Sequence, residues 1–462
     1  MSGPELAVSG KQSKVQTRSR PSSVVTTKHL DKSLQRQQET CSSVVIPKRA
    51  GAVGEEDMEE IHGIVIVGGG ICGLATARAL HGKGISSLVL EKYETLRIDG
   101  VAIGIHTNGW RALEQLGIAA ELRDTATLIT EYHNVWQKDN KSTHIPVRKE
   151  LRCVKRKDLV EALAKNLPAG TIRFGCGIEA IVADSADGHC TVLSTADSNT
   201  IKAKVLIGCD GANSVVARYL GLGNPSYLPR LVTLGLTSYP NGHPFGPQFL
   251  RFAGDDFAIG RLPVSENLVH FFVSRPSPST AGFHDEGAAQ EYVLEKLPEF
   301  PAEIAEMVRR CEPGRESLKT LTRVWYRPPW QMLLGRFQRG AVTVAGDAMH
   351  VMGPFVGQGG SAALEDAVVL ARALSRAVPP GWGGTGDAAG TSGDHDKRRI
   401  SVALGRYVGE RRARLVMLSL ESFLIGTWVT TKSLVKRLVC VAILALLGSH
   451  SRRNANYDCG RL

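Results

Sequence analysis

One continuous segment, Ile64 to Lys92, constrains the fold of this chain more than any other. Its first four residues form an apolar, β-branched run, typical of a strand that is buried on both faces. Gly68, Gly70 and Gly73 follow at G-x-G-x-x-G spacing, where glycines allow a tight turn, close approach of a pyrophosphate and close helix–strand packing. A second strand ends in Glu91, whose carboxylate suits two ribose hydroxyls. The segment predicts a site for FAD or NAD, and the alternative is a glycine turn without a ligand.

The net charge of +11 belongs to the two ends of the 462-residue chain. Residues 1–50 hold nine Lys/Arg and three Asp/Glu, and residues 427–462 hold six Lys/Arg and one Asp/Glu. In residues 51–426 the positive and negative charges therefore balance. The body therefore has no basic stripe that would indicate nucleic-acid binding. Nine cysteines are scattered without Cys/His spacing typical of metal ligands, so we predict packed thiols and no metal site.

The first sixty residues are rich in Ser, Thr, Gln and Arg and lack the apolar core of a secretory signal. They are expected to be either a transit peptide or a disordered basic tail. We therefore expect a plastid or cytoplasmic protein rather than a secreted one.

An apolar run near the end, Leu438 to Leu447, has only ten residues and is too short to span a bilayer. Basic residues flank it, namely Lys432, Lys436, Arg437, Arg452 and Arg453. We expect a buried core helix here, and the alternative is an interfacial helix with weak contact to a membrane surface. The sequence points to no protein partner.

A second motif, GCDGANSVVAR, follows directly on an apolar strand and contains Asp210 and Gly211. A third, GDAMHVMGPFVGQGGSAALEDA, also follows a strand and begins with Gly346 and Asp347. Doubly wound sheets bind ligands at the carboxyl ends of their strands, where the Asp347 carboxylate suits a ribityl hydroxyl of a flavin. The alternative is that Asp347 only caps a helix.

The third motif continues with a cluster of glycines, Gly357, Gly359 and Gly360, that opens a long helix. The backbone N–H groups and the dipole of such a helix stabilise negative charge at the N1–C2 edge of a flavin. A plain turn is the alternative. The sequence therefore indicates that the bound dinucleotide is FAD.

In this order, the three motifs resemble those of the FAD-dependent aromatic monooxygenases, the family of para-hydroxybenzoate hydroxylase, and within it the plant salicylate-hydroxylase-like enzymes. The resemblance covers residues 62–450. It implies bound FAD and a transient electron donor, NADPH or NADH. The sequence has no second G-x-G-x-x-G motif that follows a predicted strand, which fits transient docking of the nicotinamide donor without a separate domain for it. The implied reaction inserts one atom of O₂ into a small organic substrate, aromatic or isoprenoid-type, through a flavin C4a-hydroperoxide.

The implied fold is α/β: a Rossmann-like, glutathione-reductase-like FAD domain with an inserted antiparallel substrate sheet and C-terminal helices. Short alternating strands from Tyr227 to Trp325 fit the inserted sheet. The predicted parts are the tail at 1–60, the first part of the FAD domain at 61–226, the substrate sheet at 227–330, the last part of the FAD domain at 331–378, a flexible loop at 379–400 and a helical region at 401–462.

The resemblance also assigns roles to individual residues. Asp210 and Gly211 resemble the motif associated with both FAD and the nicotinamide donor, with a plain strand–turn–helix corner as the alternative. Arg156 resembles the arginine that reaches the flavin, with a solvated helix face as the alternative. Arg111 is a further candidate for the flavin, and His350 is a candidate catalytic residue with a structural histidine as the alternative.

Departures from the family pattern concern the substrate side. Leu234 stands where relatives commonly place an arginine before the glycine, and Phe355 stands where they often carry a smaller polar residue. Trp325, Trp330 and Phe355 are candidates to line an aromatic pocket or to pack in the core. Two alternative functions stay open at this point: an FAD-dependent reductase or dehydrogenase, and a non-catalytic flavin-binding regulator.

Overall fold

The computed structural model describes residues 60–98, 100–139, 141–182, 190–228, 230–254, 257–277, 291–292, 294–295, 301–311, 317–321, 323–382 and 394–462. The predicted tail lies outside these residues up to residue 59, as do residues 383–393 of the predicted loop. The chain divides into Met1–Asp57 and Met58–Leu462, and the description below concerns the second unit.

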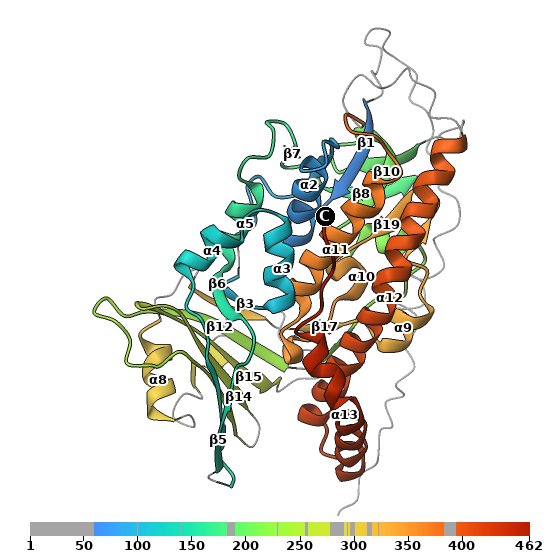
Figure 1. Cartoon of the computed structure of the whole chain (residues 1–462). Helices are drawn as coiled ribbons and strands as arrows, with labels where there is room; N and C mark the ends of the chain where they lie inside the picture. Colours follow the sequence, from blue (N-terminus) through green and yellow to red (C-terminus); the bar gives the residue numbers. More distant parts are fainter. Residues whose placement is uncertain are drawn as a thin grey trace, which may run out of the picture. The chain divides into compact units, whose positions relative to one another are not determined.

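A largely parallel sheet forms the first layer (Figure 1). Its strands, in spatial order, are β18 (Gln338–Arg339), β19 (Val342–Val344), β10 (Thr200–Gly208), β1 (Glu60–Val67), β2 (Leu88–Leu90) and β7 (Ile172–Arg173), with β9 (Thr191–Thr195) antiparallel to β10 and β8 (Ile178–Val182) antiparallel to β9. The register sets Val67 opposite both Gly208 and Leu90, so the central strands end at one level. The second half of β1 is fully buried, as its continuous apolar run predicts.

Helices pack against this sheet and against each other. The pair at the centre is α2 (Ile71–His81) and α11 (Gly359–Ser375), with α3 (Thr107–Gln115), α5 (Arg156–Ala164) and α12 (Asp394–Thr430) packed on them. Trp110 and Leu113 of α3 and Leu159 and Leu163 of α5 are the buried side chains through which these two helices pack. Among the described residues, α12 alone is long and apolar enough to cross a membrane by length and composition. Because α12 packs on α11 with its buried face, we assign it to the core.

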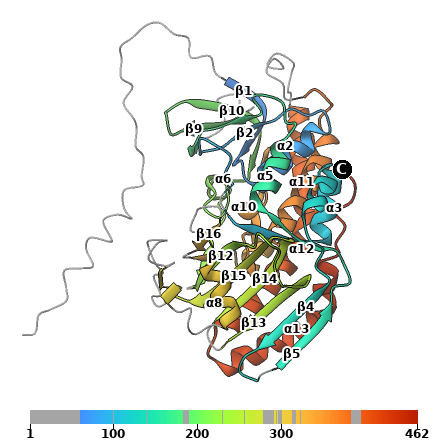
Figure 2. The ribbon, with the colours of Figure 1, turned by 90° about the vertical axis from the view of Figure 1, so that its left-hand side faces the viewer.

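A seven-stranded, largely antiparallel sheet forms the second layer (Figure 2). Its strands, in spatial order, are β16 (Leu318–Leu321), β12 (Arg230–Ser238), β15 (Leu268–Pro276), β14 (Ala258–Ser265), β13 (Gln248–Ala253), β4 (Glu131–Trp136) and β5 (Lys141–Pro146). Helix α8 (Ala302–Arg309) covers one face, where Ile304 and Met307 pack on Phe271 and Val273. The opposite face is called the inner face below.

The sheet also takes up residues from before Tyr227, where the sequence placed its start. Strands β4 and β5 lie within the predicted first part of the FAD domain, yet β4 pairs in parallel with β13. This pairing joins residues more than a hundred positions apart, and alternation along a single strand carries no information about such a partner.

The remaining elements connect the two layers. They are β3 (Ala102–His106), β6 (Leu151–Lys155), β11 (Ser226–Leu228), β17 (Val324–Tyr326), α4 (Ala119–Thr125), α6 (Val215–Tyr219), α9 (Pro329–Leu334), α10 (Asp347–His350), the 3₁₀ turn η2 (Pro354–Val356) and α13 (Leu434–Asn454). β3 pairs with β6, and β11 with β17. The result is the predicted α/β fold with an inserted antiparallel sheet and C-terminal helices.

Candidate functional site

Four of the predicted ligand-binding turns lie at the same edge of the parallel sheet. Gly68 directly follows β1, and Glu91 directly follows β2. One residue separates the end of β10 from Asp210, and one residue separates the end of β19 from Gly346. Parallel strands end at one edge, and doubly wound sheets bind their ligands at this edge. The fold therefore brings together residues that are almost 280 positions apart in the sequence.

The first glycine turn is tight on one side and open on the other. Gly68 has φ +103°, and a Cβ on it would lie 2.5 Å from the carbonyl oxygen of Cys209. A Cβ on Gly73 would lie 1.9 Å from the carbonyl oxygen of Gly68, so α2 starts directly against the turn. Nothing lies within 4 Å of the Cβ position of Gly70, the N-cap residue just before α2. The space for a pyrophosphate is therefore beside Gly70.

The Glu91 carboxylate is held against this turn. It is buried, its Oε2 accepts a hydrogen bond from the Gly69 N–H at 2.7 Å, and its Oε1 accepts one from the Tyr93 N–H at 3.0 Å. Each carboxylate oxygen has a second lone pair. Glu91 therefore has the geometry to accept hydroxyl groups of a ribose beside the glycine turn.

Asp210 has a buried acceptor that the protein leaves unused. Its Oδ2 accepts from the Val215 N–H at 2.7 Å, whereas Oδ1 is buried and has no hydrogen-bond partner among the described residues. Burial raises the pKa of this carboxyl group. The next residue, Gly211, has open space at its Cβ position. The arrangement fits a ligand that donates a hydrogen bond at Asp210.

The third motif also leaves room for a ligand. Asp347 is exposed as the first residue of α10, and its carboxylate has no hydrogen-bond partner in the described part of the chain. Gly357 is left-handed (φ +62°), and its Cβ position lies 3.5 Å from Nε2 of His106. A Cβ on Gly360 would lie 2.3 Å from Cδ1 of Ile103. Glycines are thus required where β3 approaches the start of α11, which Gly359 begins.

Comparisons with known proteins agree with this geometry. Residues 62–239 and 289–388 match the model of the FAD binding domain family. Monooxygenase 1 of Arabidopsis thaliana is 47% identical over 408 residues, which are 88% of this chain and all of that protein. Monooxygenase 2 of the same plant is 36% identical over 375 residues, 79% of this chain and 88% of that protein.

The chain belongs to the FAD-dependent monooxygenases. It is therefore an enzyme that uses FAD and a small-molecule substrate, and neither the reductase nor the regulator alternative is favoured. Two solved structures share the fold. HpxO of Klebsiella pneumoniae, crystallised with FAD and uric acid, has a TM-score of 0.64 and 19% identity, over 87% of this chain and 94% of its own. The 2-methyl-3-hydroxypyridine-5-carboxylic acid oxygenase has a TM-score of 0.65 and 19% identity, over 87% and 97%.

In this monooxygenase, His350 lies in a buried group of charges rather than at an open surface. The histidine is fully buried, and its Nε2 lies 2.7 Å from Oδ2 of Asp366. The same Oδ2 accepts from the Gly346 N–H at 2.9 Å, and Oδ1 accepts from Nε of Arg411 at 2.7 Å. This geometry favours the structural role that the sequence left open for His350.

The sequence analysis missed the rest of this cluster. Glu365 accepts from Nε of Arg414 at 2.6 Å and pairs with Arg411 at 2.7 Å. Asn108 donates to both Glu365, at 2.6 Å, and Gln358, at 2.8 Å. The only signal in the sequence is an acidic pair within the apolar stretch of α11. The cluster, named the paired cluster below, consists of His350, Glu365, Asp366, Arg411 and Arg414.

The two other predicted arginines lie in different places. Arg156 begins α5, and its side chain packs on Gly100, where a Cβ would lie 2.6 Å from Cδ of the arginine. Arg111 donates from Nη1 to the carbonyl oxygen of Asn456 at 2.6 Å. Arg111 thus ties α3 to the segment that follows α13, which is a structural contact the sequence did not indicate.

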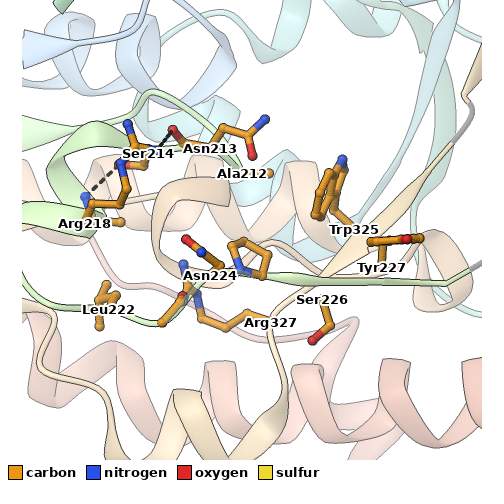
Figure 3. A pocket seen from close by; sticks show the side chains of 13 residues that line it. Ala212, Asn213, Ser214, Arg218, Leu222, Asn224, Ser226, Tyr227, Trp325 and Arg327 are labelled. Carbon is orange, nitrogen blue, oxygen red and sulfur yellow. Dashed lines mark hydrogen bonds between the residues drawn. The ribbon is translucent and has the colours of Figure 1, made fainter. Parts of the chain in front are cut away.

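A cavity of about 540 Å³ opens beside the second motif (Figure 3). Asn213 and Arg218 line one side, and Tyr227 and Trp325 stand at the other. The two rings meet edge to face with centroids 5.4 Å apart, and Arg327 reaches the cavity from below in this view. Trp325 was a candidate for an aromatic pocket and does line a cavity.

The other two aromatic candidates pack elsewhere. Trp330 is 55% exposed and meets Phe423 edge to face. Phe355 fills the space over Gly353 and Gly426, where a Cβ on either residue would lie 2.7 Å from its ring. Phe355 therefore packs between the third motif and α12.

Proposed function

We propose that FAD lies along the carboxyl edge of the parallel sheet. Gly68, Gly70 and Gly73 would hold the pyrophosphate, and Glu91 the adenosine ribose. The observation that carries this proposal is the set of unused acceptors and open glycine positions that the four turns bring to one edge. Residues proposed to contact the remainder of the cofactor are Arg156, Asp210, Gly211, Gly346, Asp347, Gly357, Gly359 and Gly360.

FAD, when bound, takes a hydride from NADPH or NADH and activates O₂, so that one oxygen atom enters an organic substrate and the other leaves as water. The chain's own contribution is placement and exclusion of water. Asp347 orients the ribityl chain, and the backbone N–H groups at Gly359 and Gly360 favour negative charge at the nearby edge of the ring system. We place the substrate between this turn and the inner face of the antiparallel sheet.

Loss of FAD on removal of Asp347 is the main test. The Asp347→Ala enzyme is expected to purify with much less FAD per polypeptide, because it lacks the carboxylate proposed to bind the ribityl chain. The substitution breaks no hydrogen bond within the described part of the chain, so the fold itself should persist. The measurement is the flavin absorbance per mole of protein, with circular dichroism to confirm folding. Asp124→Ala, which removes an exposed carboxylate from α4, is the matched control. Full FAD occupancy in the Asp347 variant would disprove the site.

We further propose that the nicotinamide donor docks in the cavity beside Asp210 and Gly211. The cavity combines a guanidinium and amides, which suit phosphates, with two rings that suit a base. In the Arg218→Ala enzyme, KM for NADPH should rise about tenfold, as expected for the loss of one charge-assisted hydrogen bond. FAD content should stay unchanged, and Arg376→Ala serves as the control. An unchanged KM would place the donor elsewhere.

Helix α13 carries a surface that supports weak contact with a membrane. Apolar residues at helical spacing are exposed along one side, among them Leu434 (71%), Leu438 (60%) and Leu446 (82%). The sequence of α13 contains no acidic residue, and Lys436 and Arg437 are exposed near its start. An apolar face with a basic rim fits an anionic lipid surface. Within Leu438–Leu447 only Cys440 is buried, and Val439 (52%) and Val441 (47%) beside it are exposed, so the expectation of a buried core helix is wrong for this run.

Sedimentation with vesicles tests this contact. The enzyme should bind vesicles of phosphatidylcholine with phosphatidylserine more than vesicles of phosphatidylcholine alone, and less as salt is added. Leu438→Glu with Leu446→Glu should abolish binding, whereas Val402→Glu, an exposed apolar residue on α12, should not. Absence of binding to either kind of vesicle would disprove the membrane contact. Self-association that the double variant removes would show instead that the exposed face of α13 contacts a second copy of the enzyme.

A further inference from the structure

We propose that Arg251 binds an oxyanion on the substrate, so that this enzyme selects aromatic molecules that carry a carboxylate or phenolate. The proposal rests on the proposed function, because it concerns the substrate side of the same site. Arg251 lies on β13 and is then a specificity-determining residue. Its position in the sheet, its surroundings and its lack of a counter-ion each support this role.

Arg251 belongs to a row of residues that crosses the sheet. The register pairs Leu234 with Phe272, Phe272 with Gly260, and Gly260 with Arg251. Directly opposite residues on neighbouring strands project from the same face of a sheet. Phe272 packs with Cys153 of β6, so this is the inner face, turned toward the β3–β6 pair.

The row contains the position where the family resemblance implies an arginine, which here is Leu234. Arg251 stands three strands away, about 14 Å at the usual spacing of about 4.8 Å between strands. The inner face therefore carries two cations at this level, Lys319 of β16 directly opposite Leu234 and Arg251 of β13, and of these two Arg251 lies over aromatic rings. An arginine on β13 and one on β12 in this row project from the same face of the sheet, so both face the proposed substrate site.

Three aromatic rings, together named the wall below, lie on the inner face beside this guanidinium: Tyr132, Phe249 and Phe272. The Arg251 guanidinium carbon lies 4.6 Å from the ring centre of Tyr132 and 5.7 Å from that of Phe249. Phe249 in turn meets Phe272 edge to face at 6.4 Å. Gly260 makes room for this ring, because a Cβ there would lie 2.0 Å from Cε1 of Phe272. A flat ring with an oxyanion matches such a wall in shape and in charge.

The guanidinium also faces the glycine turn of the third motif. Its charge acts on His106, the last residue of β3, and the side chain of His106 lies against the Cβ position of Gly357. Burial, together with the charge of Arg251, lowers the pKa of His106 to about 4. His106 is therefore neutral near pH 7. The charge near this turn is therefore carried by Arg251 and not by His106.

Arg251 has no carboxylate partner among the described residues. It is open to solvent on one side, yet burial by the surrounding protein lowers its pKa. A partly desolvated cation without a counter-ion is unfavourable, and an arriving oxyanion relieves this. The structure thus leaves on the substrate side a charge that a ligand can neutralise.

The test compares ligands that differ only in charge, on the FAD-loaded enzyme. Dissociation constants are measured from the change in flavin absorption for salicylate, 4-hydroxybenzoate and benzoate, each against the corresponding benzyl alcohol. The wild type should bind at least one of the anions more tightly than its neutral counterpart. Arg251→Met should weaken that anion about tenfold or more and change the alcohol less than about twofold, as expected for one charge-assisted contact. Arg251→Lys should restore part of the difference.

Controls separate this proposal from the proposed function. Arg309→Met removes an exposed arginine from α8, on the other side of the sheet, and should leave all constants unchanged. FAD content is measured in every variant, since its loss would count against the cofactor site instead. Full FAD content with an unchanged anion preference in Arg251→Met, or no anion preference in the wild type, would overturn the role of Arg251.

Discussion

Two regions of this enzyme place an arginine in contrasting surroundings, one buried and one exposed on one side, and they treat the charge differently. Arg411 lies within 2.7 Å of both Glu365 and Asp366, and all three side chains are fully buried. Arg251 lies over the ring of Tyr132, without a carboxylate in the described part of the chain. A buried charge that is paired with carboxylates holds the fold together, whereas a partly exposed charge without a carboxylate partner is available to a ligand. The comparison separates arginines that fix the cofactor turns from the one that faces the substrate.

The paired cluster supports the turns of the third motif from within the core. Asp366 accepts the Gly346 N–H, and Glu365 reaches Gln358 through Asn108. Both residues therefore tie turns of the third motif to the core of α11. Loss of a charge in this cluster should disturb stability first and cofactor binding as a consequence.

The largest expected effect is on Arg411. Arg411→Met leaves two buried carboxylates with fewer partners, and the free energy of unfolding should fall by about 3–5 kcal/mol. Urea unfolding followed by circular dichroism measures it. Arg406→Met, an exposed position on the same helix, is the control and should change little. A loss as small as that of the control would mean that the cluster does not hold the fold.

The next effect on stability is expected at Gly260, which makes room for the Phe272 ring near Arg251. Gly260→Ala places a methyl group 2.0 Å from the Phe272 ring, which must then move. Overpacking of this kind costs about 1–3 kcal/mol. The same unfolding measurement applies, together with salicylate affinity, which should fall because the ring leaves its place. Gly405→Ala, on α12 with open space at its Cβ position, is the control. Unchanged salicylate binding would remove Phe272 from the site.

Acid should weaken the paired cluster. Burial opposes ionisation of Asp366, but the charges of His350 and Arg411 outweigh it and lower its pKa from 3.8 to about 2. The ionised form therefore stabilises the folded state above pH 4, and this contribution, about 2 kcal/mol at about 1.4 kcal/mol per pH unit, is lost as the pH falls toward 2.

The measurement is the stability difference between the wild type and Asp366→Asn at several pH values. It should be constant from about pH 7 to 5 and should shrink as the pH falls further. Asp396→Asn, at a surface pair on α12, gives the baseline. A difference that does not depend on pH would show that Asp366 is not ionised in the folded enzyme.

The smallest effect on stability is expected at Arg251. Arg251→Met removes a charge that has no carboxylate partner among the described residues, so the free energy of unfolding should change by less than about 1 kcal/mol, in the stabilising direction. Thermal unfolding of FAD-loaded enzyme measures it. A loss comparable to that of Arg411→Met would show that Arg251 also holds the fold, and the contrast between the two regions would disappear.

The turns proposed to hold the cofactor could be predicted from the sequence because their signals are local. Three of the four turns at the carboxyl edge follow an apolar strand and lead into a helix, so Gly68, Asp210 and Asp347 could be proposed as site residues from their immediate neighbours. Parallel strands then bring these turns to one edge without further information. The order of the motifs was enough to predict the fold and the FAD-dependent reaction.

The substrate side could not be predicted in the same way, because it depends on strand partners. Whether Arg251 faces the site is decided by its register with Gly260, and β4 joins the sheet through a parallel pairing that no local pattern indicates. The absence of an arginine at Leu234 was visible in the sequence, but the cation elsewhere in the row was not. Likewise, the two arginine partners of Glu365 lie on α12, more than 45 positions later in the sequence.

The segment after α13 closes the core by returning to helix α3. The Ala455 carbonyl accepts the Asn108 N–H at 3.3 Å, the Asn456 carbonyl accepts from the Arg111 side chain at 2.6 Å, and the Leu462 N–H donates to Gln115 at 3.0 Å. Helix α3 is therefore fastened by residues that lie about 345 positions later in the sequence. Because Asn108 also holds Glu365 and Gln358, this late segment acts as a clasp on the cofactor side of the enzyme.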